Sequence, residues 1–310
     1  MQRLIIPGAA GLVGQNLIIQ LKDAGYTDIV AIDKHPTNTA ILKRLHPDIV
    51  VLDEDVAIDS SWREYVTNES VIIMLQAQIG SMHSADFVDN NIVSTQKVLE
   101  CAKDKGVGYI VHISSSVVES VADDDYTSTK KEQEKLVADS GITHCILRPT
   151  LMFGWFDRKH LGWLSRFMKR VPVFPIPGHG RYMRQPLYAS DFCRIIVSAV
   201  KKQPENETYN ITGRDNVDYI DIIREIKTAV GSKTLILKIP YSFFWILLKV
   251  YSLFDNDPPF TVSQLKALTA GDEFEVIPWW DIFEVESTGF KQAIDETFNH
   301  PEYSKIVLDF

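Results

Sequence analysis

The 310-residue sequence predicts an α/β fold in which a doubly wound parallel sheet is covered by helices on its two faces. Over residues 1–150, short β-branched runs alternate with amphipathic helical patterns, as in parallel strands joined by crossover helices. Runs that are apolar throughout, such as Val71 to Leu75, are typical of strands buried on both faces. A smaller mixed lobe is expected over residues 151–310.

The individual elements follow from these patterns. Strands are predicted at Arg3–Ile6, Asp28–Ile32, Ile49–Leu52, Val71–Leu75, Tyr109–Ile113 and Cys145–Arg148. The segment Leu12–Ala24 is predicted to be a helix because Val13, Leu17 and Leu21 share one face. A second helix is predicted at Asn91–Lys105.

The pattern changes after Pro149. Residues 155–186 are rich in Trp, Phe, Pro and Gly, and irregular structure is expected there. Helices are predicted at Ser190–Lys201 and Tyr219–Val230, and the tail from about Ser242 is expected to be helical with loops. We expect some later strands to return to the main sheet, so that the two parts of the chain interleave.

The composition excludes several classes of function. A formal charge of −9 argues against nucleic-acid binding, which requires Lys and Arg to displace counterions. Three scattered cysteines indicate reduced thiols, and no signal-peptide pattern precedes Pro7, so a cytoplasmic location is expected.

The apolar segment Pro240–Phe254 is shorter than the ~20 residues of a membrane span. It is expected to be a buried or lobe-packing helix, with a membrane-surface role as the alternative.

Gly8, Gly11 and Gly14 form a GxxGxxG motif between a predicted strand and a predicted helix. Glycines at this spacing allow a tight turn, close approach of a pyrophosphate and close packing of helix on strand. The helix N-terminus, with the N–H groups of Leu12 and Val13, would attract the phosphates. A dinucleotide-binding domain over residues 1–150 is therefore predicted.

Asp33 ends the next predicted strand. A carboxylate there would accept hydrogen bonds from the adenosine ribose hydroxyls and repel a 2′-phosphate, which favours NAD over NADP as the cofactor. The neighbouring Lys34 and His35 leave NADP open as the alternative.

Tyr126 and Lys130 form a YxxxK motif on a predicted helix, after a predicted strand that ends in Ser114–Ser116. The four-residue spacing places the phenol and the ammonium on one face. A nearby ammonium lowers the pKa of a phenol, as a general acid/base requires. Serine hydroxyls at the carboxyl end of a parallel strand would meet the substrate beside the phenol.

The order of these motifs resembles that of extended short-chain dehydrogenases/reductases, in the NAD-dependent epimerase/dehydratase family. The resemblance runs from residue 3 to about residue 213 and implies a Rossmann-type fold. The matching segments are Gly8–Gly14, Asp33, Asp53, Leu75–Ala77, Ser114–Ser115, Tyr126 with Lys130, Leu147–Thr150 and Gly178–Asp191.

The resemblance also implies residue roles. Ser115, Tyr126 and Lys130 would be catalytic, with Ser116 as the alternative serine and as a substrate contact. Lys130 would also hold the nicotinamide ribose, and Arg184 would bind a nucleotide diphosphate. Further cofactor contacts are expected from Lys34, Asp53, Leu75, Gln76, Ala77 and Pro149. No metal site is expected, because the histidines lack metal-ligand spacing.

These roles predict an NAD(P)-dependent epimerase or ketoreductase that acts on a nucleotide-linked sugar. The resemblance also implies a homodimer, because members of the family often pair through helices that correspond to Asn91–Lys105 and Tyr126–Ser140. Gln76 departs from the family, which has a small residue there, and the interval between Ser115 and Tyr126 is short. Two alternatives stay open. One is a reductase or dehydrogenase of an apolar, sterol-like alcohol. The other is a non-catalytic cofactor-binding subunit, resembling the accessory subunit of respiratory complex I.

Overall fold

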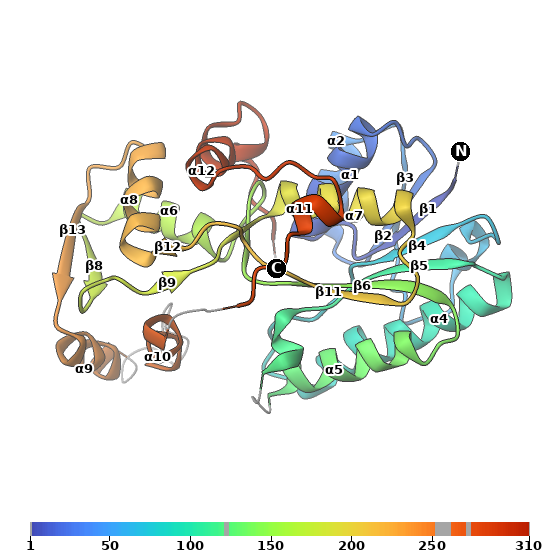
Figure 1. The fold of residues 1–310 in the computed structure, drawn as a ribbon, viewed down its shortest axis with the longest axis horizontal. Helices are drawn as coiled ribbons and strands as arrows, with labels where there is room; N and C mark the ends of the chain where they lie inside the picture. Colours follow the sequence, from blue (N-terminus) through green and yellow to red (C-terminus); the bar gives the residue numbers. More distant parts are fainter. Residues whose placement is uncertain (1, 121–123, 252–261, 271–273, 310) are drawn as a thin grey trace.

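The structure is a computed structural model that describes residues 2–120, 124–251, 262–270 and 274–309. Figure 1 shows a main sheet with its helices beside a smaller lobe, which is built from the green-yellow and orange-red parts of the chain. The amino-terminal strands, drawn in blue, belong to the main sheet.

All seven strands of the main sheet run parallel, in the order β11–β6–β5–β4–β1–β2–β3. Their bounds are β1 Leu4–Pro7, β2 Ile29–Asp33, β3 Val50–Asp53, β4 Val71–Met74, β5 Tyr109–Ile113, β6 Thr143–Pro149 and β11 Glu207–Ile211. The first six agree with the predicted strands to within one or two residues, which confirms the doubly wound fold. The strand order reverses between β1 and β4, and ligands bind at such a switch point.

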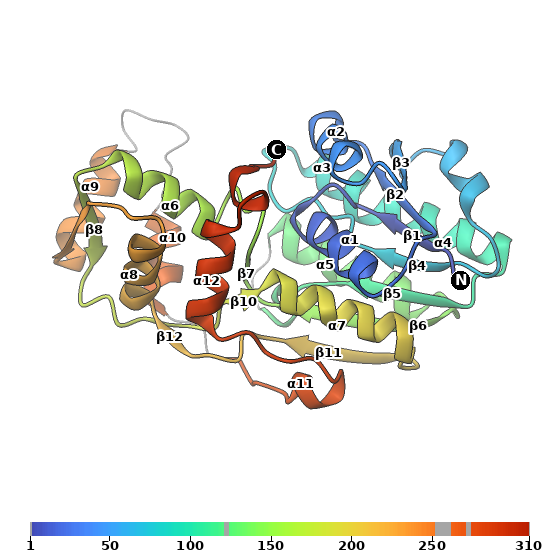
Figure 2. The same cartoon turned by 90° about the horizontal axis from the view of Figure 1, so that it is seen from above.

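Helices cover the two faces of this sheet because successive residues of each strand point to opposite sides. Leu4 and Ile6 of β1 pack with one set of helices, which includes α1 and α7, and Ile5 packs with the other, which includes α4 and α5. Figures 1 and 2 show the two layers. The helices around the sheet are α1 Leu12–Asp23, α2 Pro36–Leu45, η1 Ser61–Tyr65, α3 Ser84–Phe87, η2 Val88–Val93, α4 Ser94–Lys105, η3 Ser116–Glu119, α5 Asp125–Ala138 and α7 Ala189–Lys202.

The predicted helix Asn91–Lys105 begins as a π-helix, η2, before α4. Asn91 is fully buried in this turn, and its amide accepts a hydrogen bond from the Gln78 N–H (2.7 Å) and donates one to the Thr129 hydroxyl (2.9 Å). The wider turn therefore joins the loop after β4 to α5.

The second lobe contains more regular structure than the sequence analysis predicted. Residues 155–186, expected to be irregular, include helix α6 and strand β8, so that expectation was wrong. β8 pairs in parallel with β13 in a two-stranded ribbon, where the prolines of β8 are tolerated because one edge carries no partner strand. The elements of the lobe and tail are β7 Met152–Phe153, α6 Leu161–Arg170, β8 Val173–Pro177, β9 Met183–Arg184, β10 Leu187–Tyr188, β12 Val217–Asp218, α8 Tyr219–Ala229, β13 Leu235–Ile239, α9 Tyr241–Tyr251, α10 Val262–Ala270, α11 Trp279–Ile282, α12 Phe290–Asn299 and η4 Tyr303–Lys305.

The apolar segment that begins at Pro240 forms helix α9, but the helix is not buried. Phe243 is 52% exposed and Ile246 is 50% exposed, so the expectation of a buried helix was wrong. The end of that segment, residues 252–254, lies outside the described residues. Within the part of the chain that the structure describes, no helix is long and apolar enough to cross a membrane.

Replacing Leu17 tests the packing of α1 on the sheet. Leu17 is fully buried in the core between α1, α7 and the sheet. Leu17→Ala should lower the free energy of unfolding by about 2–5 kcal/mol in a urea titration, because it leaves a cavity. Leu237→Ala, at a position that is 47% exposed, is the matched control. Equal losses in the two variants would contradict this description of the core.

Candidate active site

The glycine-rich turn after β1 is fixed by two close backbone approaches. Gly8 has φ +80°, and a Cβ atom there would lie 2.5 Å from the Gln76 backbone nitrogen. A Cβ atom at Gly14 would lie 2.2 Å from the Ala9 carbonyl oxygen. The turn lies directly against the loop after β4 and against its own helix, so neither position has room for a side chain.

The N-terminus of α1 suits an anion. Gly11 is the N-cap of the helix, and because it has no side chain it does not accept hydrogen bonds from the first N–H groups of the helix. The first-turn N–H groups, among them those of Leu12 and Val13, have no acceptor within the helix. Unpaired N–H groups and the helix dipole together favour a phosphate, so this turn fits the pyrophosphate of a dinucleotide.

Asp33 lies at the end of β2, beside this turn. Its carboxylate accepts hydrogen bonds from the N–H of Ala10 (2.9 Å) and the N–H of His35 (3.1 Å). Burial nevertheless raises its pKa above the ordinary value. The neighbouring Lys34 forms an ion pair with Asp55 at 2.9 Å. Its ammonium is thus engaged by a carboxylate of the protein.

The other expected cofactor contacts lie along the same carboxyl edge of the sheet. Asp53 ends β3 opposite Asp33 and is exposed. Leu75 follows β4 and donates its N–H to the Pro7 carbonyl at 3.0 Å, while Ala77 is exposed. Pro149 ends β6 and is buried.

The Lys130 side chain is fully buried and is held by two acceptors. Its ammonium donates to the Ile113 carbonyl at 3.0 Å and to the side-chain oxygen of Gln133. The Gln133 amide in turn donates to the Gln76 carbonyl (3.3 Å) and to the Thr95 hydroxyl (2.8 Å). The network links α5 to the ends of β4 and β5.

Burial lowers the pKa of Lys130 to about 7, against the opposing effect of the Glu134 carboxylate. Glu134 also accepts hydrogen bonds from the Ser114 hydroxyl (2.7 Å) and from the Arg148 guanidinium. Ser114 therefore has a structural partner, which leaves Ser115 and Ser116 as the candidate catalytic serines.

Ser115 and Tyr126 are brought together as expected, and the Ser115 hydroxyl lies close enough to the phenol to affect its pKa. The Ser115 hydroxyl also accepts the Val117 N–H at 3.4 Å, which caps η3, and Ser116 is the first residue of that helix. Burial raises the pKa of Tyr126, and the neighbouring Ser115 hydroxyl only partly offsets the rise. The expectation of a lowered pKa was wrong in this structure, because desolvation of the phenol is the largest effect.

Arg184 lies in the second lobe, in the short ribbon of β9 and β12. Its guanidinium donates to the Leu268 carbonyl in α10 at 2.6 Å. The structure therefore places Arg184 against the lobe's own helix, and not at the sheet edge that carries Tyr126.

Two side chains of the network, Gln133 and Thr95, were not singled out from the sequence. Gln133 lies three residues after Lys130, so it shares a face of α5 with the lysine, and this spacing was the available signal. Thr95 gave no such signal, because only the packing of α4 against α5 brings it to Gln133.

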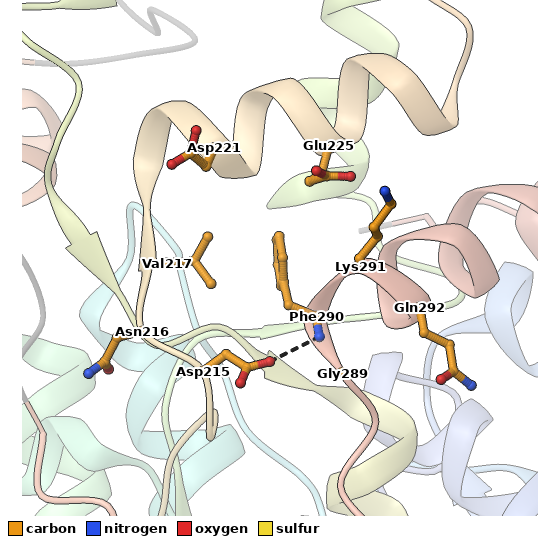
Figure 3. A pocket seen from close by; sticks show the side chains of 9 residues that line it. All are labelled: Asp215, Asn216, Val217, Asp221, Glu225, Gly289, Phe290, Lys291 and Gln292. Carbon is orange, nitrogen blue, oxygen red and sulfur yellow. Dashed lines mark hydrogen bonds between the residues drawn. The ribbon is translucent and has the colours of Figure 1, made fainter.

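A separate open pocket of about 480 Å³ lies in the second lobe, between α8 and the start of α12 (Figure 3). Asp215, Asp221 and Glu225 contribute carboxylates to it, and Asp215 accepts the Phe290 N–H at 3.0 Å. None of the predicted site residues lines it. Within the described ranges, no cluster of three or more His, Cys, Asp or Glu side chains is arranged to hold a metal ion.

The low pKa of Lys130 predicts a pH effect on stability. Between about pH 7 and pH 10.5 the unfolded chain carries a proton on Lys130 that the folded chain has lost, so folding becomes more favourable as the pH rises through this window. Lys130→Met should therefore give a free energy of unfolding that rises less with pH than that of the wild type. Urea titrations at the two ends of the window measure this, with Lys131→Met, an exposed position on the same helix, as control. Parallel pH curves for wild type and Lys130→Met would contradict the prediction.

Comparison with known proteins finds relatives in sequence and in structure. The Haloferax volcanii low-salt glycan biosynthesis protein Agl12 is 25% identical over 260 residues, which cover 74% of this chain and 82% of that protein. The UDP-glucose 4-epimerase of Thermotoga maritima with UDP-glucose has a TM-score of 0.73 at 16% identity, covering 95% of this chain and 97% of that one. The UDP-glucuronic acid 4-epimerase of Bacillus cereus with NAD has a TM-score of 0.69 at 20% identity, covering 98% of each chain.

The two solved structures show the same fold. A sequence model of the NAD dependent epimerase/dehydratase family matches residues 4–212, which is more than half of the chain. The match includes the glycine-rich turn, Ser115, Tyr126 and Lys130. It confirms the resemblance seen in the sequence and, with it, NAD as the cofactor of the family. The chain belongs to the NAD dependent epimerase/dehydratase family.

Proposed function

We propose that this protein is an NAD-dependent enzyme that acts on a nucleotide-linked sugar, as an epimerase or a ketoreductase. The observation that carries the proposal is the proximity of the Ser115 hydroxyl to the Tyr126 phenol, one helical turn from the buried ammonium of Lys130. The pair lies at the carboxyl edge of the sheet. At the same edge, the phosphate-binding turn packs at Gly8 against the loop that follows β4. Family membership supports the proposal.

When bound, NAD supplies the group that takes or gives hydride at a sugar carbon. Tyr126 moves the proton of the hydroxyl at that carbon. Because burial raises its pKa, the phenol is protonated at neutral pH, so it is ready to donate a proton to the oxygen of a carbonyl that is being reduced. The Ser115 hydroxyl, which lies beside the phenol, would orient the same oxygen.

Lys130 would act on the ribose of the cofactor. An ammonium has three N–H donors, and those to Ile113 and Gln133 account for two of them. The third is available for a ribose hydroxyl. When charged, the ammonium also stabilises negative charge on Tyr126 after proton donation.

Asp33 would select NAD. Its carboxylate lies beside the phosphate-binding turn, where it would bond the adenosine ribose and repel a 2′-phosphate. The ion pair between Lys34 and Asp55 neutralises the cation that would otherwise favour NADP.

Epimerase and ketoreductase differ in the fate of the cofactor. An epimerase keeps NAD bound and returns hydride to the other face of the sugar, whereas a ketoreductase exchanges it. In either case Arg184 would bind the diphosphate of the substrate in the second lobe, away from Tyr126, because a guanidinium makes bidentate contacts with phosphate oxygens.

Removing the phenol hydroxyl tests the proton-transfer step. Tyr126→Phe should lower kcat by about 10²–10⁴-fold with a nucleotide-sugar substrate, while NADH binding, measured by fluorescence, stays close to that of the wild type. Tyr109→Phe is the matched control. Tyr109 lies at the start of β5, the end of the strand opposite the active site, and its phenol donates to the Pro204 carbonyl at 2.9 Å. Undiminished turnover by Tyr126→Phe would exclude this mechanism. A wild type that binds NADH but turns over no nucleotide sugar would favour the non-catalytic subunit.

Neutralising Asp33 tests the choice of cofactor. The wild type should bind NADH more tightly than NADPH, and Asp33→Asn should narrow the ratio of the two dissociation constants by about tenfold, or ~1.4 kcal/mol. Isothermal titration calorimetry with both cofactors measures the ratio. Asp53→Asn, at the end of the neighbouring strand, is the comparison variant. An unchanged ratio in Asp33→Asn would show that this carboxylate does not meet the adenosine ribose.

A further inference from the structure

The far end of the second lobe exposes an apolar helix. From Tyr241 to Val250, α9 contains only two side chains that are not apolar or aromatic, Ser242 and Lys249. Most of the others are exposed: Phe243 by 52%, Ile246 by 50% and Leu247 by 46%. A helix that is apolar on all sides is ordinarily buried in a protein core or in lipid.

The exposed apolar surface continues onto the ribbon before the helix. Leu235 and Leu237 of β13 point to one side of the strand and are 60% and 47% exposed, and Val173, paired with Leu235, is 40% exposed. Figures 1 and 2 place β13 and α9 together at the end of the lobe farthest from the main sheet. Nine of the sixteen exposed large apolar side chains among the described residues belong to this surface, which we call the terminal patch: Val173, Leu235, Leu237, Tyr241, Phe243, Trp245, Ile246, Leu247 and Val250.

The chain around the terminal patch is basic, although the protein as a whole is acidic. Residues 158–190 and 226–254, which supply α6, β8, β13 and α9, contain eleven Lys and Arg residues and no Asp or Glu. The remaining 21 basic residues share the rest of the chain with all 41 acidic residues, and the net charge is −9. These two segments therefore carry a charge opposite in sign to that of the whole chain.

Several of these cations flank the patch directly. Lys233 and Lys238 are exposed at the two ends of β13. Lys169 and Arg170 are exposed at the end of α6, which joins β13 through the hydrogen bond from the Ser232 hydroxyl to the Met168 carbonyl at 2.9 Å. On α9 itself, the Lys249 ammonium lies 5.6 Å from the centre of the Trp245 ring.

We propose that the terminal patch docks the protein on an anionic lipid bilayer, with α9 lying in the plane of the interface. A helix of eleven residues is about 16 Å long, too short to cross the hydrocarbon core, so insertion is confined to the headgroup boundary. Apolar side chains enter that boundary while the flanking lysines and arginine pair with lipid phosphates, as in interfacial helices. The lobe would then be held at the membrane with the main sheet on the solution side.

The inference concerns a surface remote from Ser115 and Tyr126 and does not rest on the proposed reaction. Vesicle flotation of the full chain tests it, with vesicles of phosphatidylcholine alone and of equimolar phosphatidylcholine and phosphatidylglycerol. The wild type should float with the anionic vesicles and much less with the neutral ones, and added salt should weaken binding.

Two variants separate the apolar and the charged contributions. Ile246→Glu with Leu247→Glu should lower partitioning onto the anionic vesicles by about tenfold or more, because two inserted side chains are lost. Lys233→Gln with Lys238→Gln should lower it by about tenfold and leave the weak binding to neutral vesicles unchanged. Ile58→Glu with Val307→Glu, at positions 62% and 45% exposed outside the patch, is the matched control and should float as the wild type does.

Three results would overturn the proposal. They are no flotation of the wild type, equal flotation of the wild type with the two kinds of vesicle, or a loss of flotation in the control variant as large as that in Ile246→Glu with Leu247→Glu. Sedimentation velocity without lipid tests the alternative, in which a second copy of the chain covers the terminal patch. If the wild type is a dimer that does not float, and Ile246→Glu with Leu247→Glu makes it monomeric, the terminal patch is an interface between two copies of the chain.

Discussion

The buried ammonium of Lys130 is the interaction on which the arrangement of the active site depends. A cation removed from water destabilises the fold unless acceptors surround it, and here the Ile113 carbonyl and the Gln133 side chain provide them. These bonds hold α5 against the end of β5. Tyr126 is one turn earlier on α5 and Ser115 is two residues after Ile113, so the same contact brings the phenol to the serine hydroxyl.

The network also joins the proton-transfer pair to the phosphate-binding turn. Gln133 bonds the Gln76 carbonyl, and the Gln76 backbone is the surface that Gly8 approaches so closely that no side chain fits. The residue that departs from the family pattern, Gln76, is therefore a bridge between the two halves of the site. Both contacts are made by the backbone of Gln76, so they do not depend on which side chain stands at this position.

Local patterns in the sequence were sufficient for the first six strands of the main sheet, because parallel strands buried on both faces are continuous apolar runs and the crossover helices have one apolar stripe. The seventh strand, β11, was expected only as an unlocated strand that returns to the sheet. They were insufficient where partners are distant in the chain. The pairing of β8 with β13 joins segments about sixty residues apart, and the prolines of β8 hid the strand. The direction of the Tyr126 pKa shift was missed because spacing gives the neighbour of a group and not its depth of burial. For the same reason the apolar sequence of α9 predicted burial, whereas the structure exposes it.

Native mass spectrometry of the purified protein, with release of bound small molecules, tests the central claim most directly. The account predicts a complex with one NAD(H) per chain, which gains the mass of a UDP- or dTDP-linked sugar when such sugars are added. Retention of NAD(H) through purification would indicate the epimerase, and reversible binding of added NADH the ketoreductase. A folded protein that binds neither the cofactor nor a nucleotide sugar would contradict the account.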